Sequence, residues 1–74
     1  EKADWELETL YETIQRAYEL KMPITFTLYQ QNTWQTITGF ITTIDVLKKH
    51  LLLETATTVK AIPFLTIQEA EIDD

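Results

Sequence analysis

The stretch TITGFITTID, residues 36–45, holds the single glycine of a 74-residue chain. Its β-branched threonines and isoleucines are typical of a β-strand, where such side chains pack well on a pleated surface. Gly39 lies in the middle of this stretch rather than in a turn. A glycine inside a strand is typical of a bulge or a sharp bend. The sequence therefore predicts a long strand, over residues 34–44, that bends at Gly39.

Apolar residues fall on both faces of this predicted strand. Ile37, Gly39 and Ile41 lie on one face, whereas Phe40 and Ile44 lie on the other. A strand with two apolar faces cannot stay flat in so small a protein, because both halves must cover the same core. We therefore expect Gly39 to be the corner at which the strand bends.

Residues 4–21 are predicted to form an amphipathic helix that precedes the strands. Apolar side chains recur there at the three- and four-residue spacing of one helical face. They are Leu7, Leu10, Tyr11, Ile14, Ala17 and Tyr18. Asp4 is a suitable N-cap, and Pro23 disfavours helical geometry at Met22, so we expect the helix to end there. Trp5 lies on a flank outside this apolar stripe.

Four more segments read as strands, over residues 23–30, 50–56, 58–64 and 66–72. In the turn between the first two strands, Asn32 is expected to take the left-handed conformation that glycine usually takes. One helix followed by five strands predicts an α+β fold in a single domain, 1–74. In this fold the helix at about 4–21 caps a strongly bent, five-stranded antiparallel small barrel of the Sm-like or SH3-like kind, at about 23–72.

The composition excludes several classes of site. The chain has no cysteine, which excludes disulfides, thiolate zinc sites and cysteine nucleophiles and fits a reducing cytoplasm. No apolar run approaches the roughly 18 residues of a membrane-spanning helix. Twelve acidic and six basic residues give a net charge of −6, which disfavours binding to phosphates. We therefore expect a cytoplasmic protein with no membrane contact and with weak or no nucleic-acid binding.

Several of these residues together resemble the YolD-like family of Firmicutes and their phages. They are Gly39, Ile-Asp at 44–45, Ile-Pro-Phe at 62–64 and Ile67. A weaker, fold-level resemblance links the glycine and Asp45, six residues apart, to the first motif of Sm-like and Hfq-type proteins. Both resemblances imply a leading helix and a bent five-stranded barrel.

The family resemblance also implies a function. YolD-like proteins resemble accessory partners of error-prone Y-family DNA polymerases in SOS-type DNA damage tolerance, and are described as counterparts of UmuD. UmuD cleaves itself with a serine and a lysine, and this chain has no serine, so that activity is not implied. The expectation is a non-enzymatic adaptor that binds a protein partner and has no catalytic residue, cofactor or metal.

The alternative is a divergent Sm-like protein that binds single-stranded nucleic acid. The Sm-like uridine pocket uses an asparagine four residues after the motif aspartate, and Lys49 stands there in this chain. An Arg-Gly pair of the second motif is replaced by residues 62–64. The alternative would therefore depend on the basic cluster of Lys48, Lys49 and His50.

The candidate partner-binding residues are two aromatic side chains and this basic cluster, because interfaces favour aromatic anchors. They are Trp5, Trp34, Lys48, Lys49 and His50. Three further residues are interpreted as structural. Gly39 is the corner, Asp45 a turn-former, and Pro63, together with the charge of Lys60, discourages pairing at a sheet edge. The sequence leaves the oligomeric state open.

Overall fold

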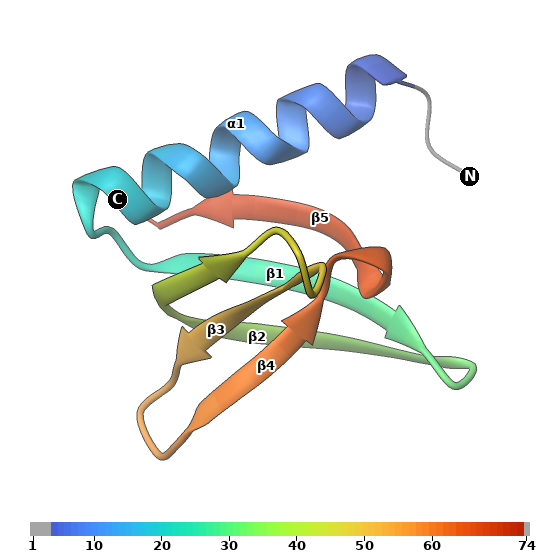
Figure 1. Ribbon diagram of the computed structural model, residues 1–74. Helices are drawn as coiled ribbons and strands as arrows, with labels where there is room; N and C mark the ends of the chain where they lie inside the picture. The colour runs from blue at the N-terminus through green and yellow to red at the C-terminus, as the bar shows by residue number, and fades with distance from the viewer. Residues whose placement is uncertain (1–3, 74) are drawn as a thin grey trace.

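The computed structural model describes residues 4–73, with side chains from residue 8 onward (Figure 1). The α-helix α1 (Asp4–Leu20) comes first and lies across one side of a sheet, along β5. The other elements are β1 (Ile24–Gln30), β2 (Thr33–Asp45), β3 (His50–Glu54), β4 (Val59–Pro63), the 3₁₀ helix η1 (Phe64–Thr66) and β5 (Ile67–Ile72). The predicted helix, the five antiparallel strands and the α+β class are confirmed.

The strands form one sheet in the order β4-β3-β2-β1-β5. The long strand β2 pairs with β1 along its first half, as far as Gly39 opposite Ile24. From Phe40 onward, which lies opposite Glu54, the same strand pairs with β3. β2 therefore belongs to two halves of a bent sheet, and it changes its partner at Gly39.

The predicted closed barrel is not present, because the sheet ends at β4 on one side and at β5 on the other. β4 ends at Pro63, which has no backbone N–H for a further bond of the ladder. The chain then turns through η1, and β5 pairs with β1 at the opposite edge. Its end is fixed by a hydrogen bond from the Asp73 N–H to the Pro23 carbonyl, at 2.9 Å.

A bulge in β2 decides which side chains reach the core. Ile41 lies opposite Leu53, but the next pair is Thr43 with Leu52, so Thr42 is an extra residue in the strand. Because one extra residue reverses the alternation of faces, Ile44 points to the same side as Ile41. The sequence placed these two isoleucines on opposite faces, and the bulge corrects that assignment.

The core lies between α1 and the bent sheet. Its buried side chains are Leu10, Ile14, Ala17, Ile24, Phe26, Leu28, Ile41, Leu51, Leu53, Ile62 and Ile67. Three aromatic residues of the predicted apolar stripes remain substantially exposed, namely Tyr11 at 50%, Tyr18 at 40% and Phe40 at 45%. The two tyrosines flank the buried centre of the helical stripe, and Phe40 lines a surface pocket together with Tyr18 at the C-terminal end of α1. The side chain of Leu7 lies outside the described residues.

Residues with a left-handed backbone conformation form the end of α1 and the turn between β1 and β2. Lys21 has φ 56°, and the Met22 N–H donates to the Ala17 carbonyl at 3.0 Å, as in a Schellman C-cap. Gln31 and Asn32 have φ 53° and 61°, so both central residues of the β1–β2 turn are left-handed. This is the type I′ geometry that matches the twist of a two-residue hairpin. The left-handed Asn32 is confirmed, and Gln31 shares its conformation.

Candidate protein-binding surface

The turn between β2 and β3 is fixed by hydrogen bonds at both ends. The Asp45 carboxylate accepts a hydrogen bond from the Lys48 N–H at 3.0 Å. The Lys49 carbonyl accepts one from the Phe64 N–H, also at 3.0 Å, which ties the turn to η1. Lys49 itself is left-handed, with φ 58°. The turn therefore has a defined shape and a defined position beside η1.

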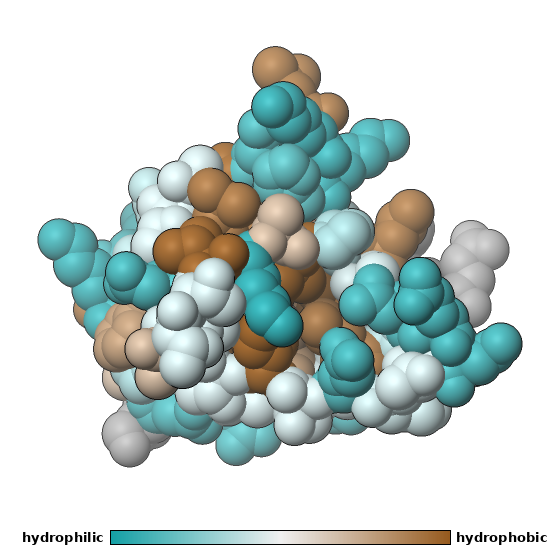
Figure 2. All heavy atoms as spheres, turned by 90° about the horizontal axis from the view of Figure 1, so that it is seen from below, coloured by the Kyte–Doolittle hydropathy of each residue, from teal (hydrophilic) through white to brown (hydrophobic). Residues whose placement is uncertain are grey.

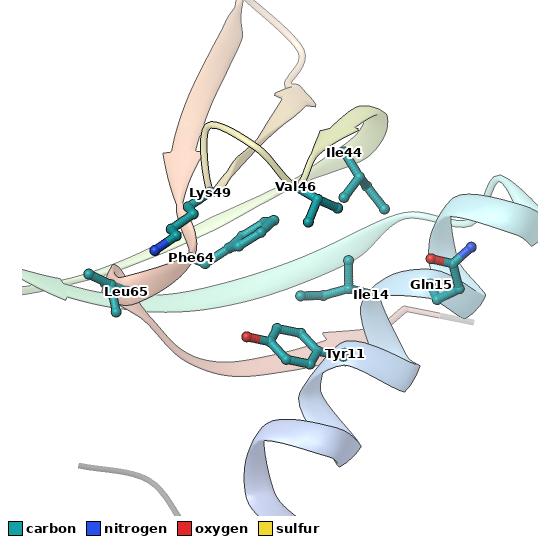
Figure 3. A pocket seen from close by; sticks show the side chains of 8 residues that line it. All are labelled: Tyr11, Ile14, Gln15, Ile44, Val46, Lys49, Phe64 and Leu65. Atoms are coloured by element: carbon teal, nitrogen blue, oxygen red, sulfur yellow. The ribbon is translucent and has the colours of Figure 1, made fainter. Parts of the chain in front are cut away.

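An apolar groove of about 550 Å³ opens between α1, this turn and η1 (Figure 3). Its lining residues are Tyr11, Ile14 and Gln15 of α1, Ile44, Val46 and Lys49 of β2 and the turn, and Phe64 and Leu65 of η1. The rings of Tyr11 and Phe64 meet edge to face, with centroids 6.3 Å apart. We call this site the α1–turn groove.

Two aliphatic side chains of the α1–turn groove, and a third that follows one of them in the turn, are highly exposed. Leu47 is 95% exposed, Leu65 90% and Val46 72%. Exposed apolar side chains gathered in this way are typical of an interaction site. Figure 2 shows that hydrophobic side chains are also visible in a hollow on the underside of the molecule, among hydrophilic ones. The apolar surface of this protein is thus incompletely covered.

A second aromatic feature lies at the β1–β2 hairpin, which projects from one end of the sheet (Figure 1). The rings of Tyr29 and Trp34 have centroids 4.9 Å apart, and Trp34 is 63% exposed. The Tyr29 hydroxyl donates to the Asn32 side-chain oxygen at 3.3 Å. No charged residue occurs between residues 22 and 44. The hairpin is therefore an uncharged aromatic end, separate from the α1–turn groove.

The structure does not bring the sequence-predicted partner residues onto one surface. Lys48 and Lys49 are exposed in the turn, but Lys49 alone of the two lines the groove. His50 is half-buried at the start of β3, opposite Asp45 and Pro63 in the ladder. Trp34 lies at the hairpin. For Trp5 the backbone lies in α1, and the side chain lies outside the described residues.

Sequence reasoning missed most of the groove. The helical spacing predicts Tyr11 as part of the packing stripe of the helix, and no sequence motif marks Val46 or Leu65 as binding residues. One signal was available, because Val46 and Leu47 are apolar residues in a turn that also carries two lysines. Turn residues are usually polar, so an apolar pair in a turn indicates a contact outside the turn.

Among the side chains that the structure describes, those of residues 8–73, no group of three or more His, Cys, Asp or Glu is placed to hold a metal ion. The described part of the chain has no buried polar or charged residue in its core. No helix among the described residues has the length and apolar character needed to cross a bilayer. The α1–turn groove therefore offers mainly apolar contact area, and Lys49 is the one charged residue of its lining.

Comparison with known proteins gives one match. The model of the family described as YolD-like protein matches residues 3–71, nearly the whole chain. Neither a curated protein nor a solved structure shows a significant match. This match covers the helix and almost all of the sheet, including Gly39, the turn and η1. The chain belongs to the YolD-like protein family.

Proposed function

We propose that this protein is a non-enzymatic interaction module that binds a protein partner through the α1–turn groove. The groove carries the proposal, because it combines a defined hollow with aliphatic side chains that water covers in the free protein. Burying Val46, Leu47 and Leu65 against a partner would remove apolar area from water, at about 25 cal/mol per Å². That gain favours association.

The partner that we propose is a Y-family translesion DNA polymerase. Membership of the YolD-like family supports this choice, through the accessory role that the family resemblance implies. With this function, the protein would act in the cytoplasm. It would take part in the tolerance of DNA damage.

The small number of possible nucleophiles and general bases in the chain is consistent with an adaptor that has no catalytic activity. The chain has neither serine nor cysteine, and His50 is its one histidine. His50 begins β3 opposite Asp45, whose carboxylate already accepts the Lys48 N–H. A nucleophile needs an oriented base within hydrogen-bond reach, and the groove lining contains no such pair.

The test is a pull-down of the cognate polymerase with the purified protein as bait. Val46→Asp places a charge in the groove at a position that is 72% exposed, so the fold should be retained. We expect this variant to weaken the complex by about 2 kcal/mol or more, as the loss of an interface anchor does. Circular dichroism of the variant checks that it is folded.

Trp34→Ala is the control at the distant hairpin, and it should leave the polymerase bound. Loss of binding with Trp34→Ala but not with Val46→Asp would move the interface to the hairpin. Trp5→Ala tests the anchor predicted from the sequence in the same assay. If the wild-type protein retains no polymerase, the proposed partner is wrong.

A further inference from the structure

The strands β5, β1 and β2 are neighbours in the sheet, and together they have one face turned away from the core. Every second residue of β1 from Ile24 to Leu28 is buried, so Thr25, Thr27 and Tyr29 point the opposite way. Residues that lie opposite each other in a ladder share a face. The register therefore adds residues of β2 and β5 to this surface, which we call the outer face. Its members are Thr25, Thr27, Tyr29, Trp34, Thr36, Thr38, Glu69 and Glu71.

Hydrogen bonds between side chains support this assignment. The hydroxyl groups of Thr25 and Thr38 lie 2.8 Å apart, and the Thr25 hydroxyl donates to the Asp73 carboxylate, also at 2.8 Å. The side chains of β1, of β2 and of the residue after β5 thus meet on one side of the sheet. Asp73 follows Glu71 by two residues, as a side chain on the same side of an extended chain does.

The charge on the outer face is entirely negative. Glu69 and Glu71 are exposed, and β1, β2 and β5 contain no Lys or Arg. The two carboxylates belong to alternate residues of one strand, whose Cα atoms are about 7 Å apart. Like charges at such a distance repel each other. A cation that binds beside Glu69 and Glu71 would relieve this repulsion.

An aromatic pair lies next to these carboxylates. Tyr29 and Trp34 are opposite each other in the ladder, and Trp34 is 63% exposed. Thr27 and Glu69 form a neighbouring row, so Glu69 is a diagonal neighbour of Tyr29. Diagonal neighbours are about 7–8 Å apart, which aromatic and other long side chains can span. The faces of tryptophan and tyrosine rings attract cations. One cationic side chain can therefore contact the aromatic pair and the Glu69 carboxylate together.

Arginine fits this combination better than lysine. Its guanidinium group is planar, stacks on aromatic rings and donates two parallel hydrogen bonds to a carboxylate. The ammonium group of lysine is a more strongly hydrated point charge. The rings could also stack on the bases of a nucleic acid, but the phosphates would then lie near Glu69 and Glu71.

We infer that the outer face binds an arginine-bearing segment of a second partner protein. The guanidinium group contacts Trp34 and Glu69, and a further basic residue of the segment lies near Glu71. None of these three residues lines the α1–turn groove, so the inference does not rest on the proposed function. An adaptor with both surfaces can hold two proteins at once.

The experiment titrates two peptides, hexa-arginine and hexa-lysine with the same dye, by fluorescence anisotropy at physiological salt. We expect hexa-arginine to bind more tightly, because lysine lacks the planar group that stacks on the rings. The emission of Trp34, measured in a Trp5→Phe background, should change on addition of unlabelled hexa-arginine. Circular dichroism checks that every variant is folded.

A matched pair of double variants separates the outer face from general attraction to an acidic protein. Glu69→Gln with Glu71→Gln should weaken hexa-arginine binding about threefold to tenfold. Glu8→Gln with Glu12→Gln removes the same charge from exposed residues of α1, and it should change binding by less than about twofold.

The aromatic contact has its own variant. Trp34→Ala should weaken hexa-arginine binding about threefold to tenfold and hexa-lysine binding less.

Four results would overturn the inference. An absence of binding would reject the site, and equal losses with the two double variants would show attraction by net charge only. Equal affinity for the two peptides would reject the preference for arginine. Unchanged binding of hexa-arginine by Trp34→Ala would exclude the aromatic pair from the site.

Discussion

The backbone carbonyl of Glu54 lies where a side chain at Gly39 would begin. A Cβ atom built on Gly39 would lie 2.9 Å from the Glu54 carbonyl carbon and 3.1 Å from the Leu53 Cγ, with the carbonyl oxygen closer still. Gly39 is not in the left-handed region, so the glycine is required by space and not by its φ angle. β2 and β3 can meet at the bend because residue 39 has no side chain.

Gly39→Ala should therefore destabilise the protein by about 3 kcal/mol, since the atoms that must move belong to the backbone of β3. Urea unfolding followed by circular dichroism measures the change. Thr36→Val in the same strand is the control, because Thr36 is exposed, and it should change stability by no more than about 0.5 kcal/mol. Equal stability of Gly39→Ala and wild type would contradict the close approach of Glu54.

The β1–β2 turn holds two non-glycine residues at positive φ, which costs roughly 1 kcal/mol or more at each. Replacing Gln31→Asn together with Asn32→Gly supplies the pair that type I′ turns prefer. We expect the double variant to be more stable by about 1 kcal/mol, as a higher midpoint in thermal unfolding. Gln30→Gly, outside the left-handed pair, should instead lower the midpoint.

The Asp45 carboxylate should contribute about 1 kcal/mol through its bond to the Lys48 N–H. Asp45→Ala removes the acceptor and should lower stability by that amount. Asp45→Asn keeps a side-chain oxygen in the same place and should retain most of it. The comparison is made by urea unfolding at neutral pH. A loss with Asn as large as that with Ala would show that charge, and not the hydrogen bond, holds the turn.

Single-stranded nucleic acid should bind weakly and without sequence preference. Lys48 and Lys49 are exposed together, but the net charge of −6 opposes phosphate binding. The exposed rings of Tyr29 and Trp34 could stack on bases, yet no cation accompanies them within residues 22–44. Fluorescence anisotropy with oligo-U, oligo-A and mixed DNA at physiological salt is the measurement. Sub-micromolar binding that is lost with Lys48→Ala and Lys49→Ala would favour the Sm-like alternative over the adaptor.

Local patterns in the sequence were sufficient for the elements themselves. The helical spacing of residues 10, 14 and 17 predicted α1, and Pro23 marked its end within two residues of the observed Leu20. Alternation predicted β1, where Ile24, Phe26 and Leu28 are buried as expected. These features depend on residues within one or two turns of each other, so they can be read without the rest of the fold.

The sequence by itself therefore determined the order of helix and strands, the α+β class and the special position of Gly39. Only the tertiary structure decided three further points. The bulge at Thr42 turns Ile44 toward the core. The edge strands β4 and β5 do not pair with each other. Side chains of α1, the β2–β3 turn and η1 come together around one groove. Each of these depends on contacts between segments distant in the chain. Local periodicity does not reveal the register of a strand or its pairing partner. Both are decided by the energy of contacts with the neighbouring strand.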